Sequence, residues 1–264
     1  MRRLVALLVL LACAGVHAEE NEWVLRIKKE AHNVAFNLSS NTVYGSGAQR
    51  IKGSGNVVEK ARNVASFSRV RLDGPVDAKL VPSSGAEAVR VSADDNIEPM
   101  VTTVVEGDTL VIGIKPGSSF STRRPGRVRV DFKQLQALQL RGSGDAQLEQ
   151  LKGDRFQLDL SSSGDVRIGL LEVRELVARL SGSGDLQVAG RAELQDWDLS
   201  GSGDASAASL SGAKARARLS GSGDLRLGVS QELDATLSGS GDLTYSGRPK
   251  LQSKVSGSGE LINR

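Results

Sequence analysis

Apolar and polar residues alternate along the C-terminal half of the chain with the period of a β-strand. Between Leu219 and Leu227, for example, leucines and glycines occupy one parity, while Ser222 and Asp224 occupy the other. A period of two sends successive side chains to opposite faces of a strand, whereas a helix needs a period of about 3.6. The pattern therefore predicts strands with inward leucines and glycines and with outward serines and aspartates.

A Gly-Ser-Gly-Asp motif, or a close variant of it, recurs through this half of the chain. Its second glycine and its acidic residue are Gly144 and Asp145, Gly164 and Asp165, Gly184 and Asp185, Gly203 and Asp204, Gly223 and Asp224, Gly241 and Asp242, and Gly259 and Glu260. The acidic residues are spaced 20, 20, 19, 20, 18 and 18 residues apart. Self-similarity at such a period is typical of repeat architectures.

One repeat cannot bury its apolar face alone, so neighbouring repeats must stack, with strands about 4.8 Å apart. Apolar residues return at nearly constant offsets after each motif, so each repeat predicts one coil of two or three short strands. The sequence predicts an all-β fold, a β-solenoid or β-helix of 18–20-residue coils over residues 138–264. Its glycines are expected at corners where opposite walls approach, because a Cβ would collide there or force a disfavoured backbone angle.

The sequence upstream of the repeats divides into two further segments. Residues 57–135 are rich in strand patterns such as 110–114, but they lack the strict repeat, so they predict an irregular β part that supplies the first coils. Together, residues 57–264 form the predicted β-helical domain. Residues 19–56 contain two Gly-Ser-Gly triplets, which fit either a linker or degenerate corners, and we interpret this segment as a lead-in.

The first 18 residues fit a secretory signal peptide. Arg2 and Arg3 precede a short apolar run, and Ala18 ends a small-residue cleavage site. Residues 10–13 also fit a lipobox, which would make Cys13 the acylated first residue of a lipoprotein. Either route predicts an exported protein that is periplasmic, associated with the outer membrane or extracellular, and that contacts a membrane only through the lipid anchor, because no later apolar run is long enough to span a bilayer.

Composition and charge narrow the classes of function. Glycine is abundant at 30 residues and aromatics make up 3% of the chain, a balance that suits tight β-turns and thin aliphatic layers. Without the signal arginines, basic residues exceed acidic ones by one, and only residues 123–127 form a local basic cluster, which is typical of a solvated loop. Nucleic acid is therefore not an expected partner.

Catalytic residue patterns are scarce. The two histidines are His17, in the signal, and His32, in the lead-in, so neither a Ser-His-Asp triad nor a histidine metal site is expected. The Gly-Ser-Gly triplets lack the strand-to-helix context of a nucleophile elbow and the following lysine of a phosphate-binding loop. The sequence predicts no enzyme activity and no cofactor.

The row of acidic residues at the corners has two interpretations. In the first, each aspartate accepts hydrogen bonds from its own local backbone in an Asx-turn, with help from serine hydroxyls and from Arg167 and Arg226. In the second, carboxylates of adjacent coils bind calcium weakly, at Asp185, Asp204 and Asp224. Like charges about 4.8 Å apart repel by about 1 kcal/mol in water, so either interpretation must supply relief. The structural interpretation is favoured because it needs no metal.

Several of these segments resemble a known family. The Gly-Asn-Val-Val opening at 55–58, the Arg-Asn-Val-x-x-Phe stretch at 62–67 and the tandem Ser-Gly-Ser-Gly-Asp units are similar to the bacterial GIN-domain family of autotransporter adhesin heads. The resemblance extends over about residues 55–262. It implies a β-helical protein of the cell envelope.

Three functions fit these observations. The first is a non-catalytic, adhesin-like module of the cell envelope that binds an envelope glycan or protein. The second is a structural spacer or lipoprotein of the envelope, and the third is a β-helical enzyme acting on polysaccharides. The enzyme is the least favoured, because sugar-binding grooves usually present aromatic side chains and the repeats hold only Phe156, Trp197 and Tyr245.

Overall fold

Strands make up almost all the regular structure of residues 50–264, the part of the chain that the computed structural model describes. The predicted signal peptide, Cys13 and most of the lead-in lie outside the described residues. The strands are β1 (Ile51–Lys52), β2 (Val57–Arg62), β3 (Arg69–Asp73), β4 (Val76–Pro82), β5 (Ala88–Asp94), β6 (Val101–Glu106), β7 (Thr109–Ile114), β8 (Phe120–Ser121), β9 (Gly126–Phe132), β10 (Ala137–Leu140), β11 (Ala146–Leu160), β12 (Val166–Leu180), β13 (Leu186–Leu199), β14 (Ala205–Ser211), β15 (Lys214–Leu219), β16 (Leu225–Gly228), β17 (Glu232–Leu237), β18 (Leu243–Ser246), β19 (Lys250–Val255) and β20 (Leu261–Asn263). A short 3₁₀ helix, η1, spans Glu98–Met100.

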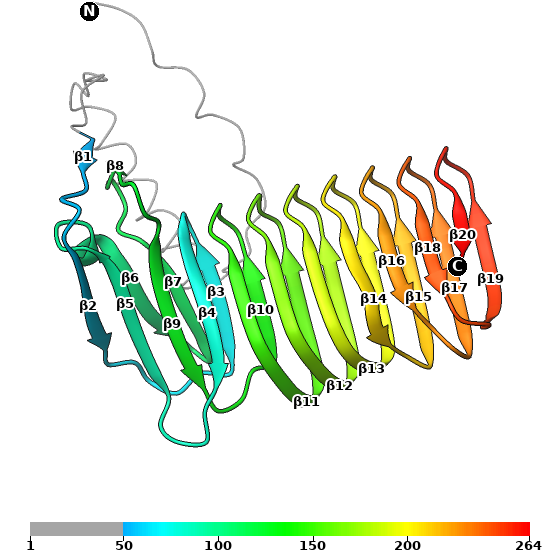
Figure 1. Cartoon of the computed structure of the whole chain (residues 1–264), viewed down its shortest axis with the longest axis horizontal. Coiled ribbons are helices and arrows are strands. Elements are labelled where there is room, and N and C mark those ends of the chain that lie inside the picture. The colour runs from blue at the N-terminus through cyan, green and yellow to red at the C-terminus, as the bar shows by residue number, and fades with distance from the viewer. Residues whose placement is uncertain (1–49) are drawn as a thin grey trace, which may run out of the picture. The chain divides into compact units, whose positions relative to one another are not determined.

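The repeats stack as parallel coils and form a β-solenoid of about six turns, as the sequence predicts (Figure 1). β11, β12 and β13 each continue from one wall of the solenoid to the other, and later coils divide the same path between two strands. The register follows the repeat length: Ala146 pairs with Val166, and Glu232 pairs with Lys250. Equivalent residues of successive coils therefore lie directly beside one another.

The core is a thin aliphatic layer between the two walls. Leu148, Leu160 and Leu219 are almost fully buried, as the alternation predicts. Trp197 is also fully buried, and its indole Nε1 donates a hydrogen bond to Gln195 Oε1 at 3.0 Å. The indole nitrogen thus finds a partner inside the protein, and Trp197 is a core residue rather than a surface contact.

The irregular part contributes two parallel layers and then changes its pairing. β3 and β4 pair in parallel with β10 and β11, and β7 and β9 pair in parallel with β3 and β4, so both pairs of strands continue the stack. Beyond them, β5 pairs antiparallel with both β2 and β9, and β6 pairs antiparallel with β7. These antiparallel strands end the solenoid at its N-terminal side.

Charged side chains close this N-terminal end. The carboxylate of Glu98 is buried and forms ion pairs with Arg62 and, at 2.9 Å, with Lys60 Nζ. Burial favours a higher pKa for Glu98, but hydrogen bonds from Lys60 and Arg62 outweigh it and the pKa lies below its ordinary value. Inward-pointing charges of this kind disfavour the addition of another strand at a sheet edge.

The described part of the predicted lead-in already belongs to the fold. Ile51 and Lys52 form β1, which pairs in parallel with β8. These two strands form a sheet of their own beside the large one. The folded body therefore begins before Val57, the boundary expected from the sequence, because β1 finds its partner about 70 residues further along the chain, where no repeat marks it.

Candidate functional site

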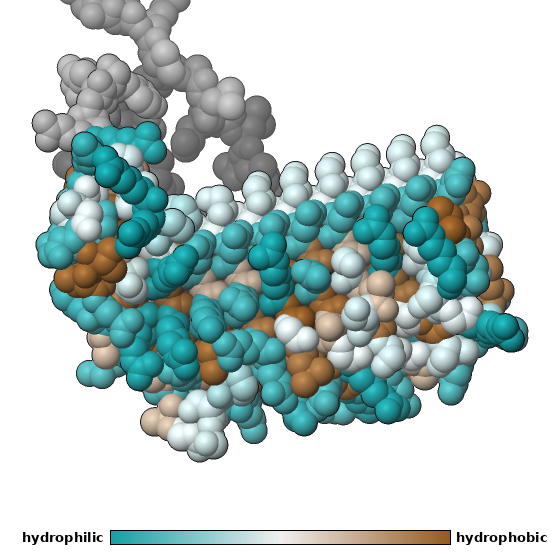
Figure 2. Space-filling model, in the orientation of Figure 1, coloured by the Kyte–Doolittle hydropathy of each residue, from teal (hydrophilic) through white to brown (hydrophobic). Residues whose placement is uncertain are grey.

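The Gly-Ser-Gly-Asp motifs all lie at corners on one long edge of the solenoid (Figure 1). The middle serine of each motif is exposed, and the row of these serines forms the corner ridge. Its members are Ser143, Ser163, Ser183, Ser202, Ser222, Ser240 and Ser258. Figure 2 shows the ridge as a line of pale side chains above a hydrophilic band. None of the exposed large hydrophobic residues of the described chain belongs to this ridge, so its surface is polar.

The glycines of the corners are required by the approach of the preceding coil. A Cβ on Gly223 would lie 2.1 Å from the carbonyl oxygen of Gly203, and one on Gly221 would lie 1.9 Å from that of Gly201. No glycine of the seven motifs has a positive φ. A Cβ would therefore collide, as expected, but with the backbone of the preceding coil and not with the opposite wall. At the corner the missing side chain points along the stack, where coils about 4.8 Å apart leave no room for a carbon.

Of the two glycine positions in the motif, the second is occupied by glycine in every copy. It is buried in all seven motifs, from Gly144 to Gly259. The first glycine is replaced by Ser162 in one motif, and the Oγ of that serine donates a hydrogen bond to the carbonyl oxygen of Gly164 at 3.3 Å. Within the seven motifs, a side chain is therefore accommodated once at the first position and never at the second.

The acidic residues form a continuous hydrogen-bonded row, which we call the corner ladder. Each backbone N–H donates to the carboxylate of the preceding coil, at 2.9 Å from Asp224 to Asp204 Oδ1 and at 2.8 Å from Glu260 to Asp242 Oδ1. The ladder consists of Asp77, Asp145, Asp165, Asp185, Asp204, Asp224, Asp242 and Glu260. The expected Asx-turn is wrong, because the acceptor lies one coil away from its donor rather than two residues away.

Backbone donors provide the relief that the repulsion between carboxylates demands. A hydrogen bond to a charged group contributes about 1.5–3 kcal/mol, which exceeds the roughly 1 kcal/mol of repulsion between neighbouring carboxylates in water. Within residues 50–264, no ion pair and no serine hydroxyl reaches the carboxylates of the seven motifs, so the relief expected from Arg167, Arg226 and the serines is not found. Among the described residues, the donors that reach the row are main-chain N–H groups.

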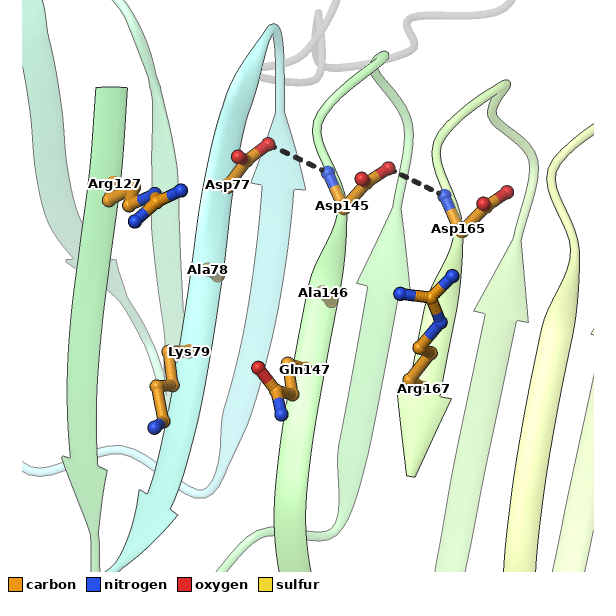
Figure 3. A pocket seen from close by; sticks show the side chains of 9 residues that line it. All are labelled: Asp77, Ala78, Lys79, Arg127, Asp145, Ala146, Gln147, Asp165 and Arg167. Carbon is orange, nitrogen blue, oxygen red and sulfur yellow. Dashed lines mark hydrogen bonds between the residues drawn. The ribbon is translucent and has the colours of Figure 1, made fainter. Parts of the chain in front are cut away.

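A shallow hollow of about 490 Å³ lies beside the first members of the ladder (Figure 3). Its walls come from β4, β9, β11 and the start of β12. Three ladder carboxylates, from Asp77, Asp145 and Asp165, line one side of it, and Arg127 and Arg167 flank them. The remaining lining residues are Ala78, Lys79, Ala146 and Gln147. The hollow thus offers carboxylate acceptors and guanidinium and amide donors, without an aromatic side chain.

Weak calcium binding is the less favoured interpretation of the ladder. Asp185, Asp204 and Asp224 are adjacent in the row, and each uses Oδ1 to accept a backbone hydrogen bond. Across the described residues, no three histidine, cysteine or acidic side chains gather closely enough to form a metal site. The chemistry of the row is therefore first that of an acceptor for main-chain N–H groups.

Asp77 is a ladder member that the sequence analysis missed. Asp145 N donates to Asp77 Oδ1 at 3.2 Å, and the two residues are 68 positions apart. The local sequence could have revealed it, because Gly74-Pro75-Val76-Asp77-Ala78 is a degenerate copy of Gly142-Ser143-Gly144-Asp145-Ala146. The regular spacing fails at this point because the segment from β5 to β9 is inserted between the two corners.

A comparison with protein families identifies the family of this chain. The family profile described as "Putative auto-transporter adhesin, head GIN domain" matches residues 66–249. No curated protein matches the sequence. Within the described residues, no helix is long and apolar enough to cross a membrane.

Solved structures of the same fold include three from species of Bacteroides and Parabacteroides. A "putative adhesin" from Bacteroides fragilis has a TM-score of 0.78 at 22% identity, covering 81% of this chain and 100% of that one. A "putative lipid binding protein" from Parabacteroides distasonis has a TM-score of 0.67 at 25% identity, covering 82% and 100%. A "putative adhesin" from Parabacteroides merdae has a TM-score of 0.63 at 23% identity, covering 81% and 99%. Likeness at such identities supports the fold.

Proposed function

The chain belongs to the GIN-domain family, and we propose that it is a non-catalytic, adhesin-like interaction module of the cell envelope. Its partner is an envelope glycan or protein, which it contacts through the corner ridge, the corner ladder and the adjoining hollow. The module is exported and acts in the periplasm or at the outer membrane.

The observation that carries this proposal is the regular polar edge of the solenoid. Exposed serine hydroxyls and carboxylates repeat along it at the strand spacing of about 4.8 Å. A repeated row of small polar groups presents many equivalent contacts to a long hydrophilic partner, and weak contacts of this kind add up when they are made simultaneously. The hollow beside Asp77 and Asp145 adds guanidinium and amide donors at one end of the row.

The chemistry of the edge favours binding over turnover. The ladder carboxylates that line the hollow are occupied by main-chain hydrogen bonds, as in the contact of Asp165 N with Asp145 Oδ1 at 2.9 Å. A glycosidase needs two carboxyl groups with different environments, one held as the acid and the other as the base or nucleophile. Equivalent carboxylates in equivalent coils do not provide that difference.

The proposal is tested with the exported chain on intact envelopes and on isolated envelope glycans and proteins. A ridge variant carries Ser202→Arg and Ser222→Arg, which add bulk at two exposed positions of the corner ridge. A control variant carries Gln231→Arg and Gln252→Arg, two exposed positions away from it. We expect saturable binding that the ridge variant loses and the control keeps. Equal binding by both variants, or conversion of a glycan into products, would contradict the proposal.

A further inference from the structure

A basic ribbon stands at the N-terminal end of the solenoid. It consists of β1 and β8 with the residues that flank them, and Figure 1 shows both strands at the edge where the corners lie. Its cations are Arg50, Lys52, Arg123 and Arg124, all of them exposed. The sequence alone reveals two of these residues, as part of the cluster 123–127. Pairing of β1 with β8 brings Arg50 and Lys52 beside them.

These cations are not neutralised by the rest of the described chain. Within residues 50–264, none of the four forms an ion pair. Two carboxylates beside the ribbon, those of Asp94 and Asp95, accept hydrogen bonds from hydroxyl groups. Asp94 is buried and accepts a hydrogen bond from Thr122 Oγ1 at 2.9 Å, and Asp95 accepts from Ser54 Oγ at 2.5 Å. Hydrogen bonds from Ser54 and Asn56 hold the pKa of Asp95 below its ordinary value.

The ribbon also contains an apolar side chain among its charges. Ile51 lies between Arg50 and Lys52, is 38% exposed and pairs with the half-buried Phe120. Hydrogen bonds fix the two strands together, from Ile51 N to Ser119 O at 2.9 Å and from Gly53 N to Ser121 O at 2.8 Å. The isoleucine is thus presented on a rigid support rather than on a free loop.

Beside the ribbon lies a hollow of about 500 Å³ that has the features of an anion site. Its lining includes the cations of Lys52, Arg123 and Arg124. The hydroxyl groups of Ser54 and Thr122 also line it, and they donate to Asp95 and Asp94. Guanidinium groups recognise phosphate oxygens through paired N–H donors. Asp94 is the one carboxylate in the lining, and its exposure is only 5%.

We propose that the basic ribbon is a membrane-facing surface that binds the phosphate headgroups of anionic lipids. The combination of exposed cations with an apolar side chain at the tip matches the boundary between headgroups and acyl chains. A soluble phosphate would bind the cations but would make no apolar contact with Ile51. This contact goes beyond the proposed function, because it is made by a different part of the molecule from the corner ridge.

The corner ladder reinforces the direction of this contact. Its row of carboxylates extends from Asp77 to Glu260, away from the ribbon. An anionic surface attracts the basic end and repels the acidic edge. The solenoid should therefore approach a membrane with its N-terminal end, which leaves the ridge free for a partner.

The test measures sedimentation of the exported chain with lipid vesicles. Cys13→Ala is included in every protein so that no acyl chain can be attached. We expect binding to phosphatidylcholine vesicles that contain phosphatidylglycerol, and little binding to vesicles of phosphatidylcholine alone. Arg123→Gln with Arg124→Gln should weaken binding about tenfold or more, because each basic residue near an anionic surface contributes substantially to attraction. Raised salt should weaken it as well.

The matched control removes two arginines from a wall of the solenoid. Arg216→Gln with Arg218→Gln changes the net charge equally but takes away cations that are paired with Asp234 and Asp196. This control should keep the vesicle binding, and Ile51→Ser should reduce it. Circular dichroism and urea unfolding confirm that each variant is folded. Equal loss in both arginine pairs, equal binding to neutral vesicles, or full competition by inorganic phosphate would overturn the proposal.

Discussion

Two kinds of charged row run along the solenoid, and they handle repulsion between coils in different ways. On the wall, signs alternate from coil to coil: Lys214 pairs in register with Glu232, which pairs with Lys250. Lys214 Nζ and Glu232 Oε2 are 2.9 Å apart. At the corner, the sign is the same in every coil, and the carboxylates bond to main-chain N–H groups of the next coil.

The difference shows which features of a stacked coil are replaceable. An ion pair on the wall depends on two long exposed side chains, and such pairs contribute little to stability. The corner depends on a short carboxylate held opposite a main-chain donor, so its geometry belongs to the stack itself. The corner ladder can therefore keep the same charge in every coil without paired basic side chains. Its carboxylates stay on the surface, where a binding partner can contact them.

The largest effect is expected from a side chain at the second glycine. In Gly223→Val, the new carbons meet the carbonyl oxygen of Gly203, and backbone cannot move aside as a flexible side chain would. We expect a loss of about 3 kcal/mol in the free energy of unfolding, at the upper end of the range for overpacking. Urea unfolding measures it. The neighbouring exposed position provides the control, and Ser222→Val should stay within about 0.5 kcal/mol of the wild type. Similar losses in both variants would refute the glycine assignment.

A smaller loss is expected when one ladder carboxylate is deleted. Asp224→Ala leaves the half-buried N–H of Asp242 without its acceptor, while it also removes repulsion with Asp204 and Asp242. The lost hydrogen bond outweighs the relief, so the free energy of unfolding should fall by about 1 kcal/mol. The measurement is urea unfolding at moderate salt. Increased stability would mean that repulsion, and not hydrogen bonding, dominates the corner.

The wall should respond less, and its response should depend on pH. A hydrogen bond from Lys214, together with its charge, holds the pKa of Glu232 below its ordinary value. Because the folded pKa is the lower one, the pair stabilises the fold above the pKa of the unfolded carboxyl, near 4.3, and this stabilisation is lost as pH falls through the folded pKa. Glu232→Gln should therefore be slightly less stable than the wild type at pH 7 and equally stable at strongly acidic pH. A difference that persists in acid would exclude the ion pair as its cause.

The repeats explain how much of the fold the sequence reveals. Spacing and alternation predict the stack, its register and the buried leucines, because each coil repeats the same pattern of apolar residues and glycines. The N-terminal cap escapes prediction because its antiparallel pairings join segments without a common pattern. Glu98 is an example, because it is buried against Lys60 and Arg62 through contacts that no repeated spacing in the sequence predicts.

The sequence identifies the residues of the candidate site but not their hydrogen-bond partners. The corner residues stand out in the sequence, yet the acceptor role of each aspartate toward the next coil was assigned instead to its local turn. Local turns are the usual partners of aspartate, and the competing long-range donor exists only once coils are stacked. The basic ribbon was partly visible as residues 123–127, while Arg50 and Lys52 join it only through the pairing of β1 with β8.

The most direct test of the account concerns Asp224→Asn with and without calcium. Asparagine keeps a side-chain oxygen for the N–H of Asp242 and removes the charge that repels Asp204 and Asp242. If the main chain stabilises the ladder, the free energy of unfolding should lie within about 1 kcal/mol of the wild type, and calcium or a chelator should move neither unfolding midpoint. If calcium raises the wild-type midpoint but not that of Asp224→Asn, and the variant is clearly less stable, the corner ladder is a metal site and the main-chain account is wrong.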